Sequence, residues 1–104
     1  MSYVDGYIFG PNDLSGSLGE FLNVFGEKTV SCVAKAAKAL RSGGKIVAMA
    51  CGASEAAVSL WSDIGFDIIF AGADWNYVYE MGRSALALIK KHTKVSFNGF
   101  CYLF

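Results

Sequence analysis

Residues 4–19, VDGYIFGPNDLSGSLG, decide the fold of this chain. The apolar run at positions 7–9 is typical of a short buried strand. Gly10 and Pro11 end that strand and fix the turn that follows. Asp13 then lies just beyond the carboxyl end of the strand, where parallel α/β folds bind their ligands. A carboxylate there is either a ligand for a hard metal ion or a turn cap, because Asp side chains also bond nearby backbone N–H groups.

The composition limits the classes of protein to which the chain can belong. Its 104 residues suffice for one small domain. The formal net charge is zero, which does not favour binding to nucleic acid or to an anionic membrane. The amino-terminal residues lack a signal-peptide pattern, and no apolar run approaches a membrane span. The three cysteines lack disulfide or metal spacing and indicate reduced thiols. We therefore expect a cytoplasmic protein that binds neither nucleic acid nor membrane.

The apolar content is high for a domain of this size. Apolar residues and glycine together, without tyrosine, make up roughly 61% of the chain, whereas about 45–50% is usual. A small domain has proportionally more surface and should be less apolar than average. The excess predicts that other protein covers part of the surface, either through self-association or through a missing amino-terminal complement.

Strand-like and helix-like segments alternate along the chain. Three nearly continuous apolar runs predict strands buried on both faces: Tyr7–Gly10, Lys45–Gly52 and Phe66–Gly72. Helical periodicity predicts three helices, one near Thr29–Leu40, one from the N-cap Ser54 to Gly65, and one from Asp74 to about Lys91. This order predicts an α/β fold of three consecutive βα units with parallel strands. The one long connection, from Pro11 to about Lys28, is predicted to be a loop that carries function.

The last residues differ from the rest of the chain. Residues 93–104 hold apolar side chains around Asn98-Gly99, a dipeptide typical of a two-residue hairpin turn. A single hairpin is marginally stable in water. The segment is therefore either a short hairpin or a disordered tail.

From Val4 to about Lys91 the sequence resembles the carboxyl-terminal part of the HpcH/HpaI aldolases, metal-dependent enzymes that act on 2-oxo acids. The stretch 4–19 is similar to that family's G-P-x-D-L-[SA]-x-S-[ML]-G strand and loop. Residues 66–74, FDIIFAGAD, are similar to its last strand and turn. The resemblance implies a partial TIM-barrel domain over residues 1–92, formed by the last three βα units of a (β/α)₈ barrel, and a tail over residues 93–104.

The same resemblance implies roles for four residues. Asp13 would be a ligand of a divalent cation of the Mg²⁺ or Mn²⁺ type. Gly10, Pro11 and Asn12 would shape a backbone that approaches the carboxylate of a pyruvate-like 2-oxo acid. The implied reaction cleaves a 4-hydroxy-2-oxo acid to pyruvate and an aldehyde, with the metal as a Lewis acid. The family's second metal-binding Glu, its His base and its carboxylate-binding Arg lie on earlier strands, so this chain alone is predicted to be inactive.

Two other functions stay open: a non-catalytic assembly or remnant module, and an unrelated small α/β binding domain. The remaining polar residues are given structural roles. His92 is predicted to be a surface residue that compensates a helix dipole. Glu20 and Glu27 are predicted to be solvated in the loop. Ser54 is either an N-cap, which we favour, or part of a phosphate site.

Overall fold

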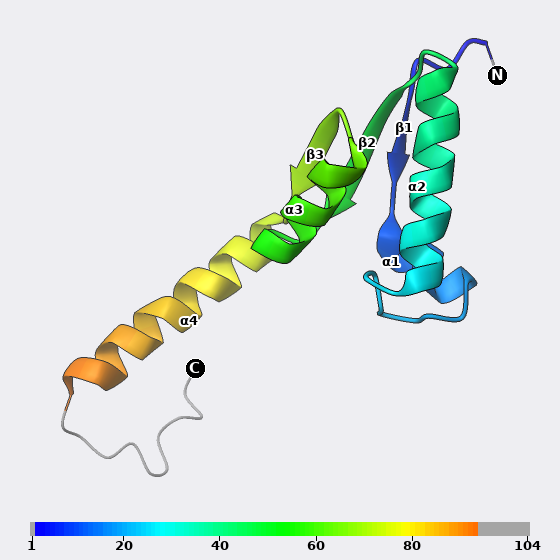
Figure 1. Cartoon of the computed structure of the whole chain (residues 1–104). Helices are drawn as coiled ribbons and strands as arrows, with labels where there is room; N and C mark the ends of the chain where they lie inside the picture. The colour runs from blue at the N-terminus through cyan, green and yellow to red at the C-terminus, as the bar shows by residue number, and fades with distance from the viewer. Residues whose placement is uncertain (1, 94–104) are drawn as a thin grey trace. The chain divides into compact units, whose positions relative to one another are not determined.

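The computed structural model describes residues 2–93 (Figure 1). Its elements are, in order, β1 (Gly6–Phe9), α1 (Pro11–Ser17), α2 (Glu27–Ser42), β2 (Ile46–Cys51), α3 (Glu55–Ile64), β3 (Ile68–Ala71) and α4 (Asp74–His92). They form two compact units with their boundary between Ala73 and Asp74. The expected tail, residues 93–104, lies outside the described residues apart from Thr93.

The first unit is built on a parallel sheet with the strand order β1-β2-β3. Tyr7 pairs with Val47, and Met49 pairs with Ile69. Helix α2 connects β1 to β2, and α3 connects β2 to β3 (Figure 1). The predicted α/β fold of parallel βα units is confirmed.

One face of the sheet carries the core, because both connecting helices pack against it. Val33 of α2, Met49 of β2 and Trp61 of α3 are each 0% exposed. Phe66 stands edge-on to the Trp61 ring, with the two centroids 6.2 Å apart. Alternate residues of each strand thus face a helix layer, as a period of two requires.

The ends of α3 follow the expected capping chemistry. The Ser54 hydroxyl accepts a hydrogen bond from the Ala57 backbone N–H at 3.3 Å. Gly65 ends the helix at a φ of 94°, a left-handed conformation that favours glycine. The N-cap interpretation of Ser54 is confirmed.

The connection after β1 is partly helical, so the prediction of a loop throughout residues 11–28 was wrong. Pro11 takes the first position of α1, where its missing N–H costs nothing. Pro11 and Ser15 are buried, and Leu14 packs against the core. Tertiary contacts therefore form a helix from a sequence of low helix propensity.

The opposite face of the sheet is largely exposed, so the prediction of strands buried on both faces was wrong for most described strand residues, although Ala48 on that face is 4% exposed. The strand register places its large side chains together: Ile8, Ile46, Ile68 and Phe70, which are 66%, 48%, 45% and 49% exposed. We call this set the bare face. The strands are apolar on both sides, but the described helices of this unit cover one side.

The second unit contains α4. None of its described residues is buried, and it exposes large apolar side chains, including Trp75, Val78 and Met81. Its last turn carries Lys90, Lys91 and His92 at the negative end of the helix dipole, as predicted. Within residues 2–93 there is no helix with the length and apolarity needed to cross a membrane.

We expect the purified chain to self-associate, because the bare face places four large apolar side chains in water. Size-exclusion chromatography with light scattering should give masses above 11.1 kDa. The double substitution Ile68→Ser and Phe70→Ser should lower the associated fraction severalfold, whereas Ala39→Ser on the exposed side of α2 should not. A sharp monomer peak with a cooperative melt would contradict this expectation.

Candidate functional site

The four residues singled out by the motif lie in one turn at the carboxyl end of β1. Gly10 is the N-cap of α1, with φ −108° and ψ 91°. Pro11 is buried beneath the turn, whereas Asn12 and Asp13 are exposed. Because α1 begins directly after the strand, this turn stands at the edge of the sheet where the parallel strands end.

The carboxylate of Asp13 folds back over Gly10. A Cβ atom placed on Gly10 would lie 3.7 Å from Oδ2 of Asp13, which is an ordinary contact. The carboxylate also lies in the first turn of α1, where a negative charge stabilises the helix dipole. Gly10 has a φ that any residue can adopt, so its backbone conformation does not require glycine.

One carboxylate does not complete a metal centre. Within residues 2–93 no three His, Cys, Asp or Glu side chains lie close enough together to hold a metal ion. A hard cation of the Mg²⁺ or Mn²⁺ type takes about six oxygen ligands, some of them water. The exposed oxygens of Asp13 fit one such position, and the other protein ligands would have to come from outside this segment.

Glu20 is partly exposed, and its carboxylate caps α2, a role that the prediction of a solvated loop residue did not include. It accepts hydrogen bonds from the backbone N–H of Thr29 at 2.9 Å, from the Thr29 hydroxyl at 2.9 Å and from the backbone N–H of Lys28 at 3.3 Å. The Thr29 backbone N–H is the main cause that lowers the pKa of Glu20. The N-cap position itself is Gly26, which has no side chain for this task. In the sequence, the one signal for this arrangement is that no residue directly before α2 has a capping side chain, so the cap has to come from a residue farther away.

The segment between α1 and α2 is tightly turned and apolar. Leu22 has a φ of 61°, the one positive φ at a non-glycine among the described residues. Phe21, Leu22 and Phe25 are exposed. Backbone bonds from Asn23 N–H to Glu20 O and from Gly26 N–H to Asn23 O close two successive turns.

We expect Gly26→Ala to weaken the cap on α2. A Cβ atom at Gly26 would overlap the Glu20 carboxylate, so Glu20 would have to leave the helix end. Urea unfolding followed by circular dichroism should show a midpoint lower by on the order of 0.5 M. Gly52→Ala is the matched control, because its Cβ atom would meet open space. Equal midpoints for the two variants would refute this role of Gly26.

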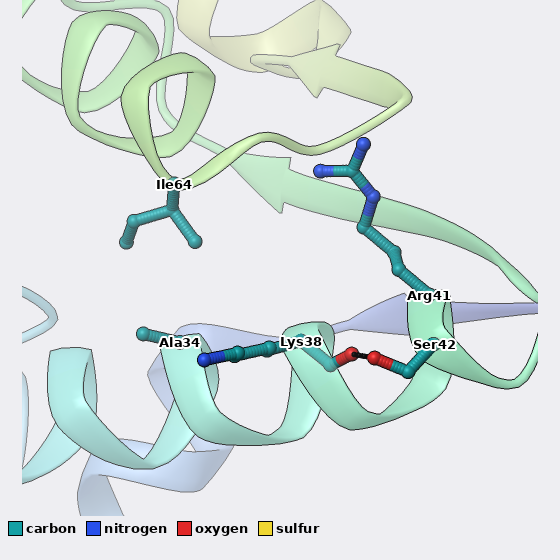
Figure 2. Close-up of a pocket in the computed structure, with 5 residues that line it drawn as sticks. All are labelled: Ala34, Lys38, Arg41, Ser42 and Ile64. Atoms are coloured by element: carbon teal, nitrogen blue, oxygen red, sulfur yellow. Dashed lines mark hydrogen bonds between the residues drawn. The ribbon is translucent and has the colours of Figure 1, made fainter.

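A groove of 540 Å³ lies at the other end of α2 (Figure 2). It is lined by Ala34, Lys38, Arg41, Ser42 and Ile64. Arg41 donates to the Gly65 carbonyl at the end of α3, and the Ser42 hydroxyl donates to the Lys38 carbonyl at 2.9 Å. Arg41 lies in the last turn of α2 and bonds the carbonyl that follows α3, so its charge compensates the dipoles of both helices. The hydrogen bonds of the groove residues therefore stabilise the ends of the two helices.

The thiol of Cys51 lies near the end of β2 and faces the core. Burial raises its pKa, so the thiol stays protonated and is a poor nucleophile. Cys32 and Cys51 are free thiols. These observations agree with a packing role for Cys51.

Three comparisons bear on the origin of the chain. No protein-family model and no curated protein matches the sequence. Among solved structures, the chain is similar to an HpcH/HpaI aldolase from Desulfitobacterium hafniense, with a TM-score of 0.79 and 24% sequence identity. The match covers 89% of this chain but 36% of that one. The likeness shows the fold: the chain is arranged like a portion of that TIM-barrel aldolase.

Proposed function

We propose that this chain forms part of an HpcH/HpaI-type aldolase barrel, in which Asp13 binds a divalent cation of the Mg²⁺ or Mn²⁺ class. The position of Asp13 carries the proposal, since its exposed carboxylate directly follows the carboxyl end of β1. TIM barrels place their catalytic groups in the βα turns at that end of the strands. The structural similarity to an aldolase supports the same reading.

The proposed reaction is the reversible cleavage of a 4-hydroxy-2-oxo acid to pyruvate and an aldehyde. A cation bound there would supply Lewis-acid stabilisation of the negative charge that develops on the substrate. Asp13 would contribute one oxygen ligand. Gly10, Pro11 and Asn12 would form the wall beside the substrate carboxylate.

The geometry of the turn supports this role for its backbone. The first helical bond of α1 runs from the Leu14 N–H to the Gly10 carbonyl at 3.2 Å. The N–H groups of Asn12 and Asp13 therefore have no acceptor within the helix. Gly10 presents no side chain that would keep a carboxylate away from them. The turn can thus offer backbone donors beside a carboxylate ligand.

The bare face supports the barrel and also a second candidate function. In a closed barrel, the strand residues that point inward fill the interior with large apolar side chains. The bare face has that composition. The same face, together with a single carboxylate, would also suit a non-catalytic assembly module. An unrelated small binding domain has no specific observation in its favour.

A chimeric barrel separates these candidates. Residues 2–93 would replace the matching portion of the Desulfitobacterium hafniense aldolase. We expect metal-dependent pyruvate release from a 4-hydroxy-2-oxo acid, measured with a coupled lactate dehydrogenase assay. Circular dichroism and light scattering would first establish that the chimera is folded. A folded chimera that binds no divalent cation and releases no pyruvate would favour the assembly module.

A further inference from the structure

Glu20 connects two helices through two different groups. Its backbone N–H donates to the Ser15 carbonyl of α1 at 2.8 Å. Its carboxylate accepts three hydrogen bonds from Lys28 and Thr29 at the start of α2. The residue therefore attaches the end of α1 to the beginning of α2.

The buried polar residues of the described chain, Ser15 and Thr29, are the partners on the two sides of Glu20, and each is 0% exposed. The Thr29 hydroxyl donates to the Glu20 carboxylate. The Ser15 hydroxyl donates to the Asn12 carbonyl at 2.7 Å. A continuous path of hydrogen bonds thus runs from α2 through Glu20 and Ser15 to the residue before Asp13.

The two helices differ in how firmly they are held. Helix α2 has 16 residues and buries Val33 and Ala37 against the sheet side of the unit. Helix α1 has seven residues, too few to be stable alone. Hydrogen bonds to an ionised carboxylate are stronger than neutral ones. The burial of Pro11 and the packing of Leu14 hold the start of α1, and the attachment through Glu20 joins its end to the longer helix α2.

We propose that Glu20 is a positioning residue that holds α1, and through it the Asp13 carboxylate, in a fixed orientation at the end of β1. This inference rests on the proposed function, because a metal ligand must be held in place to bind with useful affinity. Glu20 is not a ligand itself, and it acts through Ser15 and α1.

Hydrogen–deuterium exchange with mass spectrometry tests the positioning in the full 104-residue chain, and it does not require a monomer. We expect Glu20→Ala to accelerate exchange in peptides covering residues 11–20 about tenfold, with β2 unchanged. Glu20→Gln keeps one acceptor and should restore part of the protection. Glu27→Gln removes an exposed carboxylate from the same end of α2 and should change nothing. Unchanged exchange in Glu20→Ala would overturn the inference.

A titration with Mn²⁺ alone adds a second readout, the affinity for the metal ion, which depends on the position of the Asp13 carboxylate. Water proton relaxation would report binding of Mn²⁺ to the same substitutions made in the chimeric barrel, where the other metal ligands are present. We expect Asp13→Asn to weaken the specific binding the most and Glu20→Ala to weaken it severalfold, with rescue by Glu20→Gln. Equal Mn²⁺ affinity in the Glu20→Ala chimera and the unaltered chimera would overturn the positioning role. If Asp13→Asn has no effect, the proposed function fails, and the exchange experiment still decides whether Glu20 holds α1.

Discussion

Asp13→Ala in the chimeric barrel should lower metal-dependent pyruvate release by about 10²–10³-fold, because a Lewis-acid metal contributes several kcal/mol to such a reaction. The side chain is exposed at the end of β1, so its removal leaves no cavity in the core. The circular dichroism spectrum and the thermal midpoint should stay close to those of the unaltered chimera. Initial rates at saturating Mg²⁺ or Mn²⁺ would measure the effect.

Two further variants make this experiment specific. Asp13→Asn keeps the size of the side chain but weakens an oxygen ligand, so it should raise the metal concentration required for half-maximal rate. Glu27→Gln removes an exposed carboxylate near the start of α2 and should leave the rate unchanged. Turnover in Asp13→Ala equal to that of the unaltered chimera would remove Asp13 from the metal site.

The isolated 104-residue chain should release no measurable pyruvate from 4-hydroxy-2-oxo acids with any divalent metal. An aldol cleavage site needs several metal ligands, a base within hydrogen-bond reach of the substrate hydroxyl, and a donor for the carboxylate. Residues 2–93 provide Asp13 and the backbone beside it, but no cluster of three metal-binding side chains. Self-association would bring together copies of the same three strands, so the groups that the resemblance places on earlier strands would still be missing.

The lactate dehydrogenase assay decides this prediction as well. A separately expressed complement that contains the other βα units should restore release when it is mixed with the chain. Conversely, metal-dependent turnover by the repurified chain alone, abolished by Asp13→Ala, would show that this segment provides its own base and second ligand.

Much of the fold follows from local pattern. Continuous apolar runs ending in glycine predicted all three strands, and the capping residue Ser54 predicted the start of α3. Helix α1 was not predictable from its sequence, because Gly16 and four polar residues at positions 12, 13, 15 and 17 give it low helix propensity. Its helical form comes from the burial of Pro11 and Ser15, a tertiary effect.

The candidate site shows the same division between local and distant contacts. Asp13 could be placed from the strand that precedes it, because sequence order fixes which side chain follows a strand end. The cap formed by Glu20 joins residues nine positions apart across an irregular segment, and no periodicity marks such a pair. The bare face was unpredictable for a different reason. A continuous apolar run predicts that both sides of a strand are covered by protein. It does not say which chain provides the cover.

The placement of the two tryptophans provides an optical probe for each unit. Trp61 lies in the core of the first unit at 0% exposure, and Trp75 lies on α4 at 67% exposure. A buried indole emits at shorter wavelength than one in water. Trp75→Phe would therefore leave a blue-shifted emission that reports the sheet unit alone. Trp75 in the unaltered chain adds emission that responds to changes in the surroundings of α4.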